Sequence, residues 1–112
     1  MLAFTLRLVN MELSRAQIKR LRAEGHRLKL KPVVIIGQKG LSENLQQEID
    51  SALSHHELLK LRIPALAKAE RRELSEQICC KHRATLVEAI GGIIVIYRRN
   101  PETDRFATLL DS

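Results

Sequence analysis

The chain has 112 residues, of which 45% are apolar, and a formal net charge of +6. This length and apolar content suit one globular domain and exclude a disordered tail. No apolar run approaches the roughly 18 residues that a membrane helix needs, and the only two cysteines are adjacent. We therefore expect a single-domain, monomeric protein of the cytoplasm, without structural disulfides and without a membrane partner.

The positive charge is concentrated near the N-terminus. Between Ser14 and Lys31 there are seven Lys or Arg residues and one acidic residue, so this segment alone has a net charge of +6. Such a concentration favours contact with a polyanion, nucleic acid above all. The alternative, an ordinary solvated helix face, would suit any single one of these residues, but it suits the whole cluster less well.

The first helix is predicted over residues 14–24. Ser14 and Gln17 have the spacing of a capping box, apolar residues follow at helical intervals, and Gly25 is expected to end the helix. Three basic residues share a second face because they are spaced by four and three. The candidate binding residues of this segment are Arg15, Lys19 and Arg22, followed after the helix by Lys29 and Lys31.

A strand and a glycine-bounded loop follow. Residues 33–36 are four consecutive β-branched residues, and we expect this strand to be central because both of its faces are apolar. The loop residues are Gly37, Gln38, Lys39 and Gly40, and Ser42 then caps a second helix that extends to about His55. The glycines allow a sharp turn, and the helix N-terminus and Lys39 favour an anion. Taken alone, such a tetrapeptide is more often an ordinary turn. For the first helix to contribute to binding at this loop, it would have to fold back over the sheet.

The remaining segments complete an α/β fold. Alternation predicts a strand over residues 59–63, helical spacing predicts a helix over 68–82, and residues 85–90 and 93–97 are predicted to form a hairpin. The order α-β-α-β-α-β-β predicts a single domain with a mixed four-stranded sheet packed with helices, in which strands joined by a helix are parallel neighbours. Residues 100–112 are predicted to be a polar tail, whose apolar residues could dock locally.

Three ordered segments resemble the CRM domain (chloroplast RNA splicing and ribosome maturation), in particular its short bacterial stand-alone, YhbY-like form. They are residues 30–42, 52–61 and 94–98. The resemblance implies a domain over residues 12–99 after an extension of residues 1–11, and a fold similar to the C-terminal domain of translation initiation factor three. It also implies that Gly37, Gln38, Lys39 and Gly40 bind RNA, and that the protein associates with ribosomal RNA in precursors of the large subunit.

Other nucleic-acid-binding folds fit less well. In a KH domain the Gly-x-x-Gly loop joins two helices, whereas here a strand-like run precedes it. An RRM would display aromatic side chains for base stacking, and this chain has one Tyr, two Phe and no Trp. Recognition of the RNA backbone therefore fits better than base reading. Residue patterns alone do not distinguish RNA from DNA.

The residues do not favour catalysis. His55, His56 and Glu57 lack the spacing of a metalloprotease site, and Cys79 and Cys80 lack a zinc-ligand spacing. We expect one cysteine to pack in the core and the other to lie near the surface. The sequence thus predicts no enzyme activity, no metal and no cofactor. An interaction module whose basic face binds an acidic protein stays open as an alternative, and competition by RNA would discriminate against it.

Overall fold

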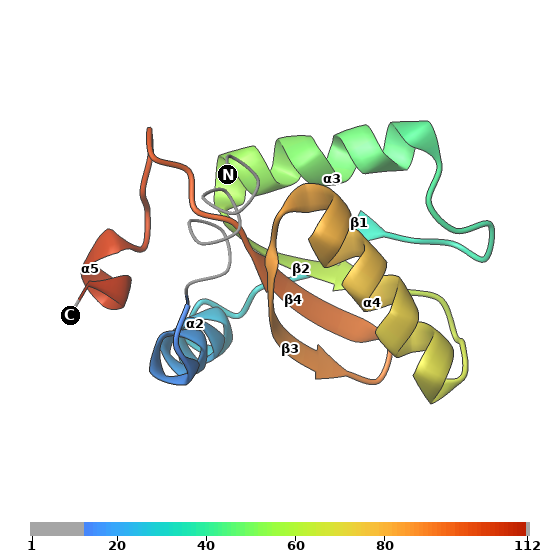
Figure 1. Ribbon diagram of the computed structural model, residues 1–112, viewed down its shortest axis with the longest axis horizontal. Helices are drawn as coiled ribbons and strands as arrows, with labels where there is room; N and C mark the ends of the chain where they lie inside the picture. The colour runs from blue at the N-terminus through green and yellow to red at the C-terminus, as the bar shows by residue number, and fades with distance from the viewer. Residues whose placement is uncertain (1–12, 112) are drawn as a thin grey trace, which may run out of the picture.

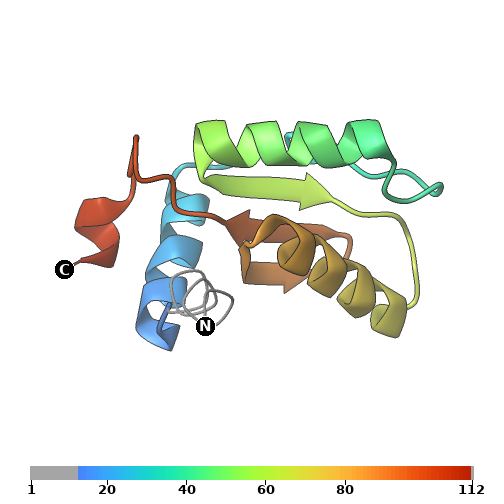
Figure 2. The same ribbon diagram turned by 45° about the horizontal axis from the view of Figure 1, so that its top comes forward.

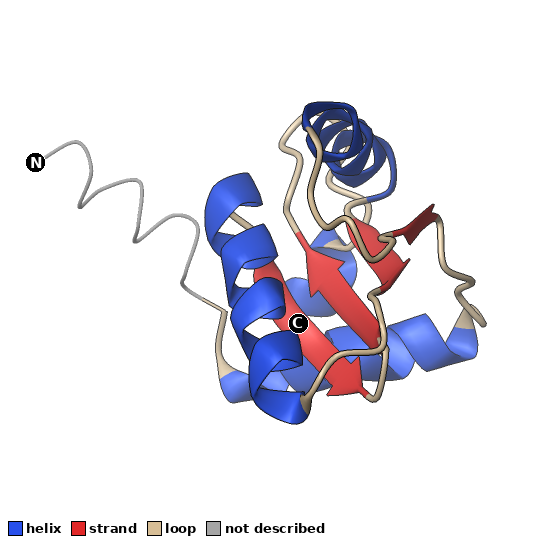
Figure 3. Ribbon diagram, turned by 90° about the vertical axis from the view of Figure 1, so that its right-hand side faces the viewer, coloured by secondary structure: helices blue, strands red, loops and turns tan. Residues whose placement is uncertain are grey.

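A four-stranded mixed sheet forms the middle layer of the computed structural model, which describes residues 13–111. Its strands are β1 (Val34–Ile35), β2 (Leu58–Arg62), β3 (Thr85–Ile90) and β4 (Ile93–Tyr97). Helices α3 (Glu43–His56) and α4 (Lys68–His82) cover one face, and α2 (Arg15–Arg27) and the short α5 (Ala107–Leu110) cover part of the other (Figures 1 and 3). The predicted order of elements is confirmed, with α5 added. The extension predicted for residues 1–11 lies outside the described residues.

Strand β4 is the centre of the fold. The strand order is β1-β2-β4-β3, and β4 pairs antiparallel with both β2 and β3. Ile94 and Ile96 are buried in the core under α3 and α4, whereas Val95 and Tyr97 are buried in a second core under α2 and α5. Because alternate residues of a strand point to opposite faces, this one strand joins the two cores.

The prediction that residues 33–36 form a central strand was wrong. Strand β1 has two residues and lies at the edge of the sheet, parallel to β2. Val34 and Ile36 are buried, but Val33 and Ile35 are 51% and 65% exposed on the other face. The apolar run that is buried on both faces is β4, and it separates β2 from β3. Those two strands are therefore not the parallel neighbours that the helix between them had suggested.

Helix α2 is longer than predicted. The capping box of Ser14 and Gln17 is confirmed, but the helix passes through Gly25 to Arg27. Gly25 is buried with helical backbone, and a Cβ atom there would make an ordinary contact, 3.5 Å from Leu30 Cδ1, so nothing at this position ends the helix. The left-handed residue after the helix is instead Lys29, with φ of 54°.

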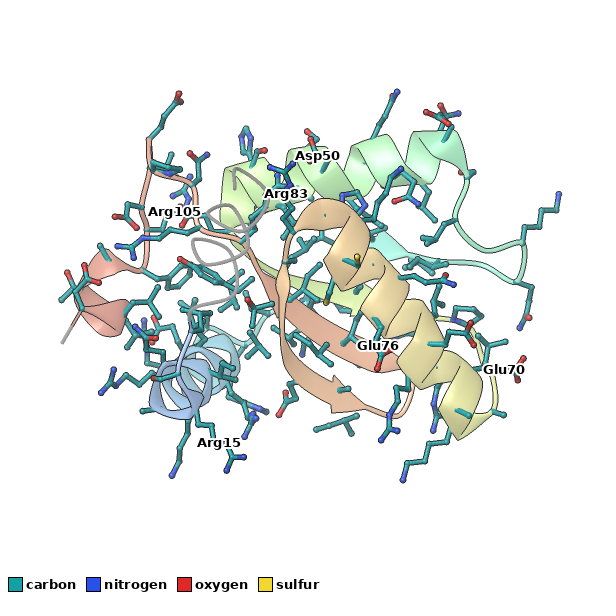
Figure 4. The ribbon with its side chains drawn as sticks, viewed as in Figure 1. Arg15, Asp50, Glu70, Glu76, Arg83 and Arg105 are labelled. Carbon is teal, nitrogen blue, oxygen red and sulfur yellow. The ribbon has the colours of Figure 1, made fainter. Side chains whose placement is uncertain are left out.

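The C-terminal segment is docked rather than loose. Leu110 is buried against α2, and the Gln17 side-chain amide donates to its carbonyl at 3.1 Å. The buried Glu57 carboxylate accepts hydrogen bonds from Thr103 Oγ1 at 2.5 Å and from the Arg105 amide at 3.0 Å. Figure 4 shows Arg105 reaching toward the end of α3, where its Nε donates to the carbonyl of His55. The local docking considered for residues 100–112 therefore describes this segment.

The two cysteines lie on different sides of α4, as predicted. Cys79 packs against the core, and Cys80 is exposed. Burial raises the pKa of the Cys79 thiol to about 12, and the neighbouring Cys80 and Glu76 add to the effect. Because the thiolate is the reactive form, this shift disfavours reaction of Cys79 at neutral pH.

His82 closes the C-terminal end of α4 from inside the protein. It is 6% exposed, and its Nε2 lies 2.6 Å from Gln46 Oε1 on α3. Burial lowers the pKa of His82; Arg98 and Lys81 lower it further, and Asp50 opposes them. The folded protein therefore holds this imidazole neutral at pH values where the unfolded chain begins to take up a proton.

This difference predicts a pH-dependent stability. Above the ordinary histidine pKa of 6.5, the contribution of neutral His82 is complete. As pH falls from 6.5 toward the lower folded-state pKa, the unfolded chain binds more protons than the folded chain, so the free energy of unfolding decreases. We expect His82→Gln to lose less stability than the wild type between pH 7.5 and pH 5 in urea titrations. His56→Gln, which changes an exposed histidine, should lose as much as the wild type. Equal losses in all three proteins would contradict this assignment.

Candidate nucleic-acid interface

The Gly37–Gly40 loop projects from the end of β1 at one end of the molecule (Figure 2). The Gly40 amide donates to the Gly37 carbonyl at 3.0 Å and closes a turn, whose central residues Gln38 and Lys39 are exposed. Gly40 has φ of +81°, a conformation that favours glycine, whereas Gly37 does not need positive φ. The second glycine therefore shapes the turn, and the first leaves open space beside it.

The loop presents free donors. Within the part of the chain that the structure describes, the amides of Gln38 and Lys39 and the ammonium of Lys39 have no partner. At the N-terminus of α3, Ser42 accepts from the Leu45 amide at 3.1 Å, as expected of an N-cap, and Glu43 places a negative charge in the first turn. The free donors of this region therefore lie in the loop itself.

The predicted basic residues of α2 divide into two groups. Arg15 and Lys19 are exposed and have no ion pair among residues 13–111, and Figure 4 shows Arg15 turned away from the sheet. Arg22 is engaged: its guanidinium donates to the Val87 carbonyl at 3.2 and 3.4 Å and lies 3.9 Å from the Glu88 carboxylate. Val87 is the extra residue of a β-bulge in β3, so Arg22 satisfies a carbonyl that lies at the break in the ladder.

The loop and α2 do not form one compact site. Figures 1 and 2 place them at opposite ends of the sheet, in a molecule whose longest extent is 38 Å. Lys29 and Lys31 are exposed in the connection from α2 to β1. Helix α2 does fold back onto the sheet, but it covers the face opposite α3 and α4 and stays away from the loop.

Sequence reasoning missed three basic residues, two on the sheet between these ends and one beside the loop. Lys60 and Arg62 are on β2, on the same face as the α2-packed Leu58, because strand residues alternate. Lys60 lines a crevice with Arg22 and His26 of α2. Arg62 lines an open groove with loop residues 37 and 38, and Arg71 of α4 joins it there. The alternation of Lys60 and Arg62 with the buried Leu59 and Leu61 was the available signal.

Neither a cluster of metal ligands nor a membrane-spanning helix is found in the described residues. Over residues 13–111 no three His, Cys, Asp or Glu side chains converge as ligands would. None of the helices in this range is both long and apolar enough to cross a bilayer.

Comparison with known proteins identifies the family. The model of the CRS1/YhbY (CRM) domain matches residues 13–98. The chain belongs to this family. The resemblance seen in the sequence is therefore confirmed, and the match covers all of the sheet and every helix from α2 to α4.

Individual relatives agree with this family. The chain is 36% identical over 95 residues to a protein of Pseudomonas aeruginosa named as a probable RNA-binding protein, covering 85% of this chain and 89% of that one. It is 37% identical over 73 residues to an RNA-binding protein of Haemophilus influenzae, covering 65% and 74%. The solution structure of a hypothetical protein of Staphylococcus aureus, proposed to bind RNA, has a TM-score of 0.69 at 34% identity, covering 79% and 90%. None of these names is that of an enzyme.

Replacing each of the two loop glycines by alanine should affect the free energy of unfolding differently. Gly40→Ala should lower the free energy of unfolding by about 1 kcal/mol, because a side chain at positive φ is strained. Gly37→Ala should leave it unchanged or slightly higher, since a Cβ atom there meets nothing within 4 Å. Urea titrations of both variants provide the measurement. A Gly37→Ala protein as unstable as Gly40→Ala would show that this description of the turn is wrong.

Proposed function

We propose that this protein binds structured RNA, and that the Gly37–Gly40 loop holds the RNA backbone. The observation that carries the proposal is the exposed turn with free amides, the Lys39 ammonium and Arg62 beside it. Free amides and cationic side chains are the donors that bind phosphate oxygens. Membership of the CRM family and the names of the relatives support RNA as the polyanion.

A second contact surface is the exposed side of α2. Arg15 and Lys19 are free of ion pairs among the described residues, and Lys29 and Lys31 continue the positive charge toward β1. Lys60 and Arg62 lie on the sheet between these residues and the loop. An RNA that contacts both ends must cross the sheet on its α2 side, which favours a folded RNA over a short single strand. Arg22 contributes less, because its guanidinium already binds the β3 bulge.

The proposed recognition depends mainly on backbone and shape. Among the described residues the aromatic rings are unsuited to base stacking: Tyr97 is buried and packs against Phe106, with ring centroids 6.0 Å apart. An RRM-like platform is therefore missing from this part of the chain. The proposal involves no chemical step and no cofactor.

The biological target is part of the proposal. We propose that the protein acts as a monomer in the cytoplasm, on ribosomal RNA within precursors of the large ribosomal subunit. The support is the resemblance of residues 30–42, 52–61 and 94–98 to the stand-alone ribosome-associated form of the CRM domain.

Variants of the loop should weaken RNA binding without unfolding the protein. We expect Lys39→Ala to weaken binding about fivefold and to reduce the slope of log affinity against log salt by about 0.7, the value for one phosphate contact. Gly37→Asp should weaken binding more than Gly37→Asn, because the two side chains match in size and only Asp adds a negative charge. Fluorescence anisotropy with ribosomal RNA fragments at several salt concentrations provides the measurement.

Two controls make this test decisive. Lys81→Ala removes an exposed lysine at the far end of α4 and should bind like the wild type. Thermal melts should show that all variants remain folded. If Lys39→Ala and Gly37→Asp bind like the wild type, the loop is only a turn. If an acidic protein rather than RNA competes for the basic surfaces, the interaction-module alternative is correct.

The ribosomal target can be tested in cell extracts. In sucrose gradients the protein should co-sediment with large-subunit precursors and be scarce on finished ribosomes. Gly37→Asp should move to the top fractions, whereas Lys81→Ala should sediment like the wild type. Recovery of the wild-type protein only in the top fractions, even after lysis at low salt, would contradict the proposed role in assembly.

A further inference from the structure

An open groove lies beside the Gly37–Gly40 loop, at the end of the sheet. Its volume is about 570 Å³, within the usual range for small-molecule pockets. Its lining includes Gly37 and Gln38 of the loop and residues 63–65, which follow β2. The groove is therefore continuous with the place where we propose that the RNA backbone is held.

The groove has an apolar wall. Ile35 of β1 is 65% exposed. The half-buried Ile93 of β4 lies on the same face of the sheet, because Arg62 of β2 is paired with Ile35 on one side and with Ile93 on the other. Pro64 adds a rigid ring to the lining. Exposed isoleucine on a strand is costly in water unless something covers it. Helix α2 covers only the other part of this sheet face, so the wall is accessible.

The rest of the groove is positively charged. Arg62 and Arg71 both line it, no acidic residue lines it, and neither guanidinium has a partner among residues 13–111. A guanidinium plane can stack on a nucleobase and also bind a phosphate. Gln38 supplies an exposed amide, which can both donate and accept hydrogen bonds at the edge of a base.

We propose that this groove holds an unpaired nucleobase of the RNA, next to the backbone contact at the loop. The inference rests on the proposed function and adds base recognition to it. The base packs against the row formed by Ile35, Arg62 and Ile93, where the Arg62 guanidinium can stack on its ring. An apolar wall with two cations suits a flat aromatic ring attached to a phosphate better than it suits an apolar peptide, which would leave both arginines unpaired.

The test uses three RNA duplexes of the same sequence. One is fully paired, one contains a bulge of unpaired nucleotides, and one contains the same bulge with abasic nucleotides, which keep the phosphates but lack the bases. The wild type should prefer the normal bulge to the abasic bulge by about fivefold, at the lower end of the range for stacking of one base. Arg62→Gln and Ile35→Ser should lose this preference. Both changes are at exposed residues outside the cores, so the fold should survive.

Matched controls separate the groove from the rest of the surface. Arg72→Gln changes an exposed arginine of α4 outside the groove, and Ile90→Ser changes an apolar residue of β3 that is 63% exposed. Both should keep the wild-type preference. Lys39→Ala should weaken binding to all three duplexes by the same factor, because it removes a backbone contact.

The outcomes distinguish this inference from the function on which it rests. Equal binding of normal and abasic bulges by the wild type would overturn base recognition while leaving backbone binding intact. A wild-type preference that survives in Arg62→Gln and Ile35→Ser would place the base elsewhere and overturn the assignment to this groove. If these variants weaken binding to all three duplexes by the same factor, Arg62 contacts only the phosphates. Failure of the wild type to bind any duplex would refute the proposed function itself.

Discussion

Burial of β4 on both faces is the constraint on which the rest of the structure depends. Ile94 and Ile96 extend one core toward α3 and α4, and Val95 and Tyr97 extend the other toward α2 and α5. A strand with two apolar faces needs a neighbour on each edge and a layer on each side. Strands β2 and β3 are the neighbours of β4 on its two sides, although β4 is the last strand in the chain. The whole domain must therefore be in place before β4 is fully covered.

The position of β1 follows from this arrangement. Since β4 occupies the centre, β1 is left at the edge with only β2 as a partner, and it keeps two paired residues. The edge position leaves the Gly37–Gly40 loop free to project from the sheet (Figure 2). It also leaves Ile35 uncovered, because α2 packs over the other end of this face. The same constraint that completes the core thus exposes the candidate interface.

Charge in this protein has both structural and interfacial uses, and the contacts separate them. Arg22 binds the carbonyl of the β3 bulge, and Arg98 binds Asp50, Ser54 and the carbonyl of His82. These side chains stabilise the junctions between elements. Lys39 and Arg62 have no such partners in the described part of the chain. Cations that are already paired gain less from a phosphate than free ones do, so the free residues carry the proposed RNA contact.

The sequence by itself determined the features that depend only on residues close together in the chain. The capping box of Ser14, the N-cap Ser42, the helix over 68–82, the hairpin at Gly91 and Gly92 and the loop of residues 37–40 all follow from backbone preferences over a few positions. Only the tertiary structure decided the strand order, the edge position of β1 and the passage of α2 through Gly25. It also decided that Arg62 of β2 and Arg71 of α4 both line the groove beside the loop. These features depend on which faces are buried against which, and local patterns carry no information about that choice when several apolar runs compete for the centre of one sheet.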